Sequence, residues 1–317
     1  MSVFPDVRGR LHVGRWSSRA VANRVASTLT AVSDRPVPAV LSIAGSDSGG
    51  GAGIQADLKA FARCGVHGMT AIAALTAQNT VGVSGVHPVP GDFIVAQVKA
   101  VAEDIGVDAV KIGMLGTAET VRAVREALEL LEPDTPVVLD PVMVAESGAV
   151  LLDEPARAAI VEELLPRATV ITPNVPEARV LAGAGDAGEP GGGDVEWLAR
   201  RLHDLGPAAV VVTGGHRDEA TDLFFDGERF ERIPGERYPD GAAHGSGCTH
   251  SSALAAHLAL GYSPLEAARA ARRIAGEAVR DGIRGLGAGA GPVDVFALTK
   301  AARSRAREGR AAAGPLA

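Results

Sequence analysis

One short segment of the chain combines residue types that together can bind an anion. From His244 to His250 the sequence is His-Gly-Ser-Gly-Cys-Thr-His, and small and apolar residues follow to Gly261. Glycines that alternate with small residues let backbone N–H groups converge on one point. A helix that begins there directs the positive end of its dipole to the same point. The spacing therefore predicts an anion-binding loop at a helix N-terminus.

The same segment contains a candidate reactive thiol. Cys248 lies in the first turn of the predicted helix, where the helix dipole is expected to lower the thiol pKa and favour the thiolate. The alternative is a plain glycine-bounded helix start with a buried, inert cysteine. The motif by itself leaves both interpretations open.

Polar or glycine residues also follow the predicted strands. The segments concerned are Gly45–Ser48, Thr76–Asn79, Asp140, Thr172–Glu177 and Thr213–Gly215. Each one alone would be an ordinary turn. In an open parallel sheet, however, ligands bind beyond the carboxyl ends of the strands. Five such endings therefore predict a polar cleft along one edge of a sheet.

The segments that must position these residues show alternately the hydrophobic period of a strand and that of a helix. The predicted strands are Ala39–Ala44, Met69–Leu75, Ala109–Leu115, Val137–Asp140, Thr169–Thr172 and Ala208–Thr213. The predicted helices are Ile54–Cys64, Gly91–Ile105, Ala118–Leu131, Pro155–Leu165 and Val195–Leu205. This alternation predicts an α/β protein with a mostly parallel sheet and helices on both faces.

Three further segments complete the outline. Asp222–Tyr238 predicts a β-hairpin, with Asp226-Gly227 supplying the turn. From Ser246 the pattern is helical to the end, with breaks at Gly261 and at Gly285–Gly291. Gly183–Gly193 is expected to be a flexible surface loop, because strands continue on both sides of it. We therefore expect one domain.

Several common motifs are excluded. A dinucleotide-binding G-x-G-x-x-G starting at Gly49 fails, because its sixth position is Ile54. A Walker loop is excluded because none of the four lysines follows a glycine. There is no G-x-S-x-G of a serine hydrolase. The histidines His216, His244, His250 and His257 lack metal-ligand spacing, so capping or core roles are expected.

Composition narrows the class of protein. The chain of 317 residues is 46% hydrophobic and 22% charged, as in ordinary globular proteins, and no apolar run is long enough to span a membrane. Two cysteines support neither a disulfide scaffold nor a cysteine zinc site. A net charge of −7 and 3% aromatic residues argue against broad nucleic-acid binding. We expect a cytoplasmic protein.

The charge is concentrated at the two ends. Residues 1–37 hold six Arg against two Asp, and residues 300–317 hold five cationic residues against one Glu. We expect a disordered basic extension over 1–37, one catalytic domain over 38–299 and a basic tail over 300–317. A transit peptide also fits the Arg-rich, acid-poor N-terminus, as does a start codon placed too early.

Seven ordered blocks resemble the hydroxymethylpyrimidine/phosphomethylpyrimidine kinases of thiamine synthesis. They are Ile43–Asp57, Ala77–Thr80, Lys111–Leu115, Val138–Met143, Thr172–Ala178, Gly214–His216 and Gly245–Thr249. The resemblance runs from about Ala39 to Phe296. It implies a ribokinase-like three-layer α/β/α sandwich that binds ATP and Mg²⁺.

The resemblance also implies roles for particular residues. The pyrimidine pocket would be formed by Gly45, Asp57, Gln78, Met114 and Val142. The amide of Gln78 suits an aminopyrimidine edge, because it both donates and accepts. The alternatives are a loop-capping amide for Gln78, a helix-surface carboxylate for Asp57, and core positions for Met114 and Val142.

At the other end of the site, the resemblance implies a phosphate and metal region. Asp140 and Glu177 would hold Mg²⁺, and Asn174, Glu177, Thr213 and Gly215 would contact the nucleotide; strand-end and helix-cap roles are the alternatives. The amides of Gly245, Ser246, Gly247 and Cys248 would hold the transferring phosphoryl group. As a hypothesis, Cys248 is the general base. The family usually has lysine where this chain has Thr213, so one cationic contact near the nucleotide is expected to be missing.

Three functions remain to be distinguished. The first is an ATP-dependent kinase that converts 4-amino-5-hydroxymethyl-2-methylpyrimidine to its monophosphate and then its diphosphate, acting as a homodimer without nucleic-acid or membrane partners. The second is a pyridoxal kinase, but similar two-cysteine enzymes carry a cysteine in the flap that is absent from Val144–Gly148. The third is a non-catalytic sensor, which should have lost the Gly245–Cys248 loop or Asp140; neither is lost.

Overall fold

The computed structural model describes residues 35–144, 148, 151–184, 195–214, 220–239 and 241–302. The chain divides into a unit over Met1–Val32, which lies outside the described residues, and a unit over Ser33–Ala317. All elements below belong to the second unit.

A single mixed sheet forms the centre of this unit. Its strands are β1 (Ala39–Gly45), β2 (His67–Gln78), β3 (Val83–Pro88), β4 (Ala109–Ile112), β5 (Val137–Leu139), β6 (Val170–Ile171), β7 (Ala209–Val212), β8 (Asp222–Phe225) and β9 (Phe230–Ile233). The order is β3-β2-β1-β4-β5-β6-β7-β8-β9. The six inner strands are parallel, and β3, β8 and β9 join antiparallel at the two edges. The predicted mostly parallel sheet and the β8–β9 hairpin are confirmed.

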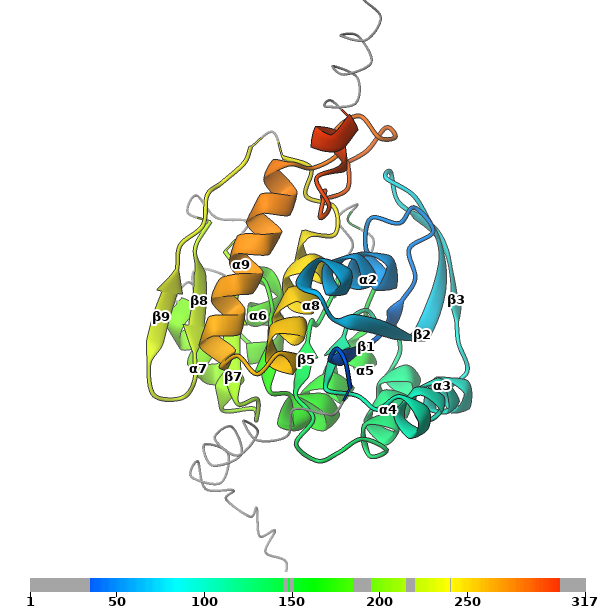
Figure 1. Cartoon of the computed structure of the whole chain (residues 1–317). Coiled ribbons are helices and arrows are strands. Elements are labelled where there is room, and N and C mark those ends of the chain that lie inside the picture. The colour runs from blue at the N-terminus through cyan, green and yellow to red at the C-terminus, as the bar shows by residue number, and fades with distance from the viewer. Residues whose placement is uncertain are drawn as a thin grey trace, which may run out of the picture. The chain divides into compact units, whose positions relative to one another are not determined.

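Helices cover both faces of the sheet (Figure 1). One face carries α2 (Gly53–Cys64), α8 (Ser246–Ala259) and α9 (Pro264–Arg280). The other carries α3 (Gly91–Asp104), α4 (Ala118–Leu128), α5 (Glu154–Ala159), α6 (Val175–Ala182) and α7 (Val195–His203). This arrangement confirms the three-layer α/β/α sandwich of the ribokinase-like fold.

Alternation along the strands explains the two hydrophobic layers. In β1, Leu41 and Ile43 belong to the core cluster beneath α3 and α4, whereas Val40 belongs to the cluster beneath α8 and α9. Successive strand side chains point to opposite faces, so a strand buried on both sides is apolar throughout. The central helix α8 is buried at every residue from Thr249 to Leu258. The helix that presents the predicted anion loop is therefore anchored in the core.

Two elements were not predicted. The edge strand β3 is mostly exposed and lacks an apolar pattern, but it pairs with the far end of β2, which extends past the predicted Leu75. Helix α6 has only eight residues. Its capping box, Asn174-x-x-Glu177, is a start signal that the sequence does contain.

Some predicted bounds were wrong. The helix expected over Pro155–Leu165 is α5 followed by a π-helical turn at Ile160–Leu164 and a 3-10 turn at Leu165–Arg167. The predicted break at Gly285–Gly291 is wider in the structure, because α9 stops at Arg280 and residues 281–297 form turns and bridges before residues 298–302 become helical again.

The predictions for the two ends and the glycine loop concern residues that are mostly not described. The extension over 1–37, the tail over 300–317 and the loop Gly183–Gly193 stay predictions. At the boundary, Arg35 pairs with the Asp108 carboxylate and donates to the Ile105 carbonyl. Among the described residues, no helix has the length and apolarity that crossing a bilayer requires.

Candidate active site

A crevice opens where the strand order reverses. From β1 the chain proceeds to β2 on one side, and it later returns to place β4 on the other. The loops beyond these strands diverge: the Gly45 N–H donates to the Met114 carbonyl at 3.1 Å, and the Ser46 N–H donates to the Ala74 carbonyl at 2.8 Å. Such a switch point is where open α/β sheets bind ligands. A cavity of about 420 Å³ occupies this position.

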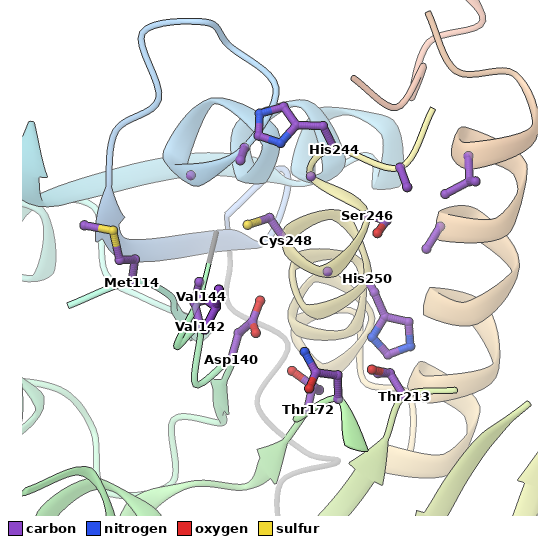
Figure 2. Close-up of a pocket in the computed structure, with 18 of the residues that line it drawn as sticks. Met114, Asp140, Val142, Val144, Thr172, Thr213, His244, Ser246, Cys248 and His250 are labelled. Carbon is purple, nitrogen blue, oxygen red and sulfur yellow. The ribbon is translucent and has the colours of Figure 1, made fainter. Parts of the chain in front are cut away.

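Most of the predicted site residues line this one cavity. They are Gly45, Gln78, Met114, Asp140, Val142, Asn174, Glu177, Thr213, Gly245, Ser246, Gly247 and Cys248. Figure 2 shows the side chains of several of them converging from the strand ends and from the start of α8. Gly215 lies outside the described residues, so its role stays a prediction. Asp57 is not at the cavity wall.

The anion loop has the predicted backbone form. Gly245 is the N-cap of α8 with φ 84° and ψ 10°, a left-handed conformation, and no side chain caps the helix. The loop packs tightly against the first glycine segment, because a Cβ on Gly245 would lie 1.8 Å from the Gly51 carbonyl oxygen. The N-terminal amides of α8 thus face the cavity without a competing side chain, as an anion site needs.

Replacing Gly245 by Ala should therefore destabilise the fold. A side chain in the left-handed region costs about 1–3 kcal/mol, and the overlap with Gly51 adds to that cost. The free energy of unfolding from urea titration measures the effect. Gly247→Ala is the matched control, because a Cβ there has no neighbour within 4 Å. Equal stability of the two variants would contradict this account of the loop.

The expected activation of Cys248 by its helix is wrong for the free protein. The residue is partly exposed at the cavity wall, but its thiol lies deep in the protein. Burial raises the pKa of Cys248 to about 12, although the Lys111 ammonium and an N–H donated by Gly53 act in the opposite direction. The free-energy cost of removing the thiolate from water exceeds the stabilisation that Lys111 and the Gly53 N–H provide. The resting form is therefore the neutral thiol.

Asp57 has a different place from the one predicted. Its carboxylate is fully buried and forms an ion pair with Lys111, with 2.8 Å between Oδ1 and Nζ. Ser42 and Ser252 donate to the same carboxylate at 2.6 and 2.8 Å. It is thus neither a cavity residue nor a surface carboxylate. Its contact is with Lys111, which does line the cavity.

Lys111 is a site residue that sequence reasoning missed. Burial alone would lower the pKa of this ammonium, but Asp57, Cys248 and Asp140 together raise the pKa above its ordinary value. Lys111 therefore remains a buried cation next to Cys248. The available signal was a single lysine inside the apolar strand β4.

Two carboxylates meet at the opposite wall. Asp140 accepts from the Ser251 hydroxyl at 2.9 Å. Glu177 accepts from the N–H groups of Asn174 and Met143 at 2.9 and 3.2 Å. Burial raises the pKa of Asp140, and burial followed by the Asp140 charge raises the pKa of Glu177 to about 7. The Lys111 ammonium acts in the opposite direction on Asp140, but burial outweighs it.

This donor set fits a hard divalent cation. Oxygen ligands suit Mg²⁺, which commonly takes one or two carboxylates and completes its shell with water and phosphate. The described residues contain no group of three His, Cys, Asp or Glu side chains placed to hold a metal. Asp140 and Glu177 would therefore supply part of the shell only.

A second missed contact joins the two glycine segments. The Asp47 carboxylate accepts from the N–H groups of Gly49, Gly51 and Ala52, and it lies 3.0 Å from Nε2 of His244. Burial would raise the pKa of Asp47, but the His244 contact and the backbone donors lower it. The pair fixes the first loop against the residue before Gly245.

Comparison with known proteins places the chain in a family. The sequence model described as phosphomethylpyrimidine kinase matches residues 47–294. This chain belongs to the phosphomethylpyrimidine kinase family. The matched range contains every predicted site residue except Gly45.

Individual relatives agree with this assignment. The hydroxymethylpyrimidine/phosphomethylpyrimidine kinase of Rhizobium meliloti is 48% identical over 259 residues, or 81% of this chain and 96% of the relative. The thiamine biosynthesis bifunctional protein ThiED of Geobacter sulfurreducens is 45% identical over 85% of this chain and 54% of its own length. A pyridoxal kinase from Staphylococcus aureus, solved with AMP-PCP and pyridoxal, superposes with a TM-score of 0.74 at 35% identity and covers 84% and 96% of the two chains. The kinase family is thus supported by both sequence and fold.

Proposed function

We propose that this family member phosphorylates 4-amino-5-hydroxymethyl-2-methylpyrimidine with ATP, first to the monophosphate and then to the diphosphate, in thiamine biosynthesis. One observation carries the proposal. The uncapped amino end of α8, with Cys248 in its first turn, opens into the same cavity as Gln78 and the carboxylates of Asp140 and Glu177. One end of the cavity is therefore suited to a heterocycle, and the other end is suited to phosphate groups.

The heterocycle end is formed at the mouths of β1, β2 and β4. Gly45 leaves room for Met114, since a Cβ there would lie 2.8 Å from the Met114 methyl group. Met114 and Val142 offer apolar contact to a ring, and the Gln78 amide offers a donor and an acceptor to its edge. Thr76 donates to the Gln78 amide oxygen at 3.2 Å and so helps to orient it.

The phosphate end would hold the ATP phosphates. Asp140 and Glu177 would bind Mg²⁺, which supplies charge neutralisation at the phosphates when it is bound. The amides of Gly245, Ser246, Gly247 and Cys248 would stabilise the charge on the transferring phosphoryl group. Asn174, Thr213 and Gly215 would contact the nucleotide, although only the first two lie at the described cavity wall.

Cys248 is proposed as the group that accepts the proton of the substrate hydroxyl. Its sulfur lies at the junction of the two ends of the cavity, next to the amides that would hold the phosphoryl group. Because burial raises the pKa of its thiol to about 12, only a small thiolate fraction is present near neutral pH. The second phosphorylation would use the same site, since the acceptor remains at the same end of the ligand.

A pyridoxal kinase is the alternative, favoured by the structural similarity to the Staphylococcus aureus enzyme. The absence of a cysteine from Val144–Gly148 favours the pyrimidine. The test is ADP release by the purified protein with ATP, Mg²⁺ and each alcohol, with products identified by mass. We expect faster turnover of the pyrimidine and formation of both phosphates. Faster turnover of pyridoxal would overturn the assignment, and no ADP release with either alcohol would favour a sensor.

The homodimer also stays a prediction. Light scattering coupled to size-exclusion chromatography would determine the mass in solution, for which the chain mass of 32.3 kDa is the monomer reference.

A further inference from the structure

Three ionisable side chains form a buried cluster at the cavity wall, just beyond the phosphate loop. His250 comes from α8, Asp222 from β8 and Arg272 from α9. Nε2 of His250 lies 3.1 Å from one Asp222 carboxylate oxygen, and Nε of Arg272 lies 3.9 Å from the other. Their side chains are 5%, 1% and 13% exposed, respectively, and all three residues line the cavity.

The histidine has unused hydrogen-bonding capacity. Among the described residues, neither ring nitrogen of His250 has a hydrogen-bond partner; the 3.1 Å contact with Asp222 has the distance of an ion pair but not the alignment of a hydrogen bond. A buried polar atom without a partner is costly, so most such atoms in proteins are satisfied. Nδ1 of His250 is thus a group that a ligand in the cavity can complete.

The surroundings determine the kind of ligand. Asp222 accepts an N–H from Gly214 at 3.0 Å, which fixes the carboxylate beside the ring. When Nδ1 carries a proton, it is a donor that has no partner within the protein. Arg272 supplies a cation, and one of its terminal nitrogens donates to the Ala220 carbonyl. The cluster therefore presents an unpartnered ring nitrogen next to the Arg272 guanidinium, a combination that suits an anion.

The position matches the path of a nucleotide phosphate chain. His250 lies two residues beyond Cys248 and faces Thr213 (Figure 2). Thr213 pairs through a β-bridge with Asn174, the N-cap of the helix that carries Glu177. His250 therefore lines the same cavity as the phosphate loop and lies next to Thr213, one of the residues proposed to contact the nucleotide. We propose that His250, oriented by Asp222, donates from Nδ1 to a phosphate oxygen of the bound nucleotide. This inference rests on the proposed function only in taking the nucleotide to be the ligand.

The first test is ADP affinity, measured by isothermal titration calorimetry with the full chain. A charge-assisted hydrogen bond at a buried site corresponds to about a tenfold or greater change in affinity. We expect His250→Leu, and His250→Gln as a polar replacement of similar size, to bind ADP at least about tenfold more weakly. His257→Leu is the matched control, because His257 lies buried on the same helix but bonds to the Ala253 carbonyl outside the cavity.

A second variant distinguishes the contribution of charge to ADP affinity from the contribution of side-chain packing at His250. Thr213 faces the same cavity and lies next to Asp222, so Thr213→Lys introduces a cation on the neighbouring strand. In the His250→Leu background, Thr213→Lys should restore ADP affinity to within about threefold of the native value. Because a lysine at position 213 is itself expected to contact the nucleotide, the same substitution in the His257→Leu background gives the baseline gain in affinity. The gain in the His250→Leu background should exceed this baseline.

Either of two outcomes overturns the proposal. One is His250→Leu and His250→Gln binding ADP within threefold of the native protein. The other is weakened binding that Thr213→Lys does not restore, since His250 would then act through packing and not through charge. Because ADP binding needs no acceptor alcohol, native ADP binding without pyrimidine phosphorylation would reject the proposed function and leave this test intact.

Discussion

The Cys248→Ala variant should turn over the pyrimidine alcohol about 100-fold more slowly than the native protein, or more slowly still. The thiol stands beside the amides of Gly245–Cys248, where the acceptor hydroxyl must meet the phosphoryl group. Removing it takes away the side chain that is proposed to accept the hydroxyl proton. Steady-state kcat with saturating ATP and Mg²⁺ measures the effect.

The pH dependence of kcat gives a sharper test of the same role. Burial raises the pKa of the Cys248 thiol to about 12. Below that pH, the thiolate fraction increases about tenfold with each unit of increasing pH. If Cys248 is the base, kcat of the native protein should rise between pH 7 and pH 9. In Cys248→Ala this rise should disappear.

The chain offers a matched control in its other cysteine. Cys64 ends α2, lies outside the cavity and has a thiol pKa raised to about 11 by burial. Cys64→Ala should keep the native kcat and the native pH profile. Native turnover by Cys248→Ala would mean that the loop amides alone are sufficient, because phosphoryl transfer requires little proton transfer in its loose transition state.

Lys111→Met should destabilise the fold by about 3–5 kcal/mol, the usual cost of breaking a buried ion pair. The substitution leaves the Asp57 carboxylate at 0% exposure with only the hydroxyls of Ser42 and Ser252 as donors. Replacing one partner is expensive because the other charge stays buried without compensation. Chemical denaturation followed by circular dichroism gives the free energy of unfolding.

Two further variants distinguish the loss of the Lys111–Asp57 ion pair from the general effect of replacing a lysine. Lys99 pairs with Glu103 on the surface of α3 at 3.7 Å, so Lys99→Met should change stability by no more than about 0.5 kcal/mol. The double variant Lys111→Met with Asp57→Leu should recover a large part of the loss, because no charge is then buried alone. A Lys111→Met protein as stable as Lys99→Met would contradict the buried-pair account.

Local sequence patterns were sufficient to predict most of the fold. Helix α2 runs from Gly53 to Cys64 and ends at Gly65 in a left-handed conformation, as its periodicity and the glycine predict. The polar strand ends also met at one cavity, because parallel strands bring their carboxyl ends to one edge. The spacing of the glycines was sufficient to predict the loop before α8.

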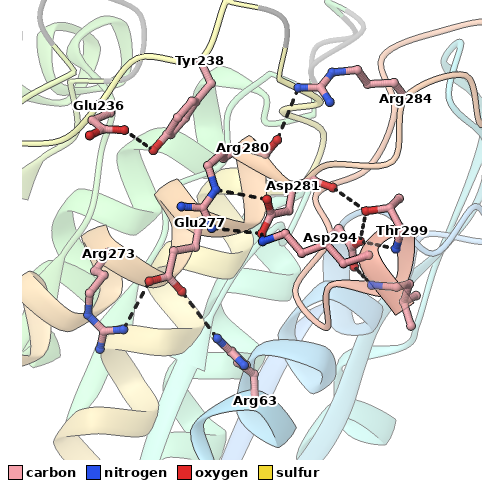
Figure 3. Close-up of polar contacts among 12 residues, drawn as sticks. Arg63, Glu236, Tyr238, Arg273, Glu277, Arg280, Asp281, Arg284, Asp294 and Thr299 are labelled. Atoms are coloured by element: carbon pink, nitrogen blue, oxygen red, sulfur yellow. Dashed lines mark hydrogen bonds and ion pairs between the residues drawn. The ribbon is translucent and has the colours of Figure 1, made fainter. Parts of the chain in front are cut away.

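Nonlocal contacts decided the elements that were missed. The segment after α9 is rich in glycine, and polar side chains fix its turns. Asp294 accepts from the N–H groups of Leu298 and Thr299, and Lys300 reaches Asp281 at 2.6 Å (Figure 3). Such polar contacts leave no periodic signal, so the predicted break at Gly285–Gly291 was narrower than the non-helical segment over 281–297.

The sequence by itself determined the α/β layers, the edge of the sheet that bears the site, and the loop of Gly245–Cys248, since these follow from short-range spacing and strand direction. Only the tertiary structure decided that Asp57 holds Lys111, that His250 meets Asp222, and that the Cys248 thiol rests in its neutral form. Each of those outcomes depends on burial and on charges from separate elements. The free energy of a charge is determined by what surrounds it in space, which the order of residues along the chain does not specify.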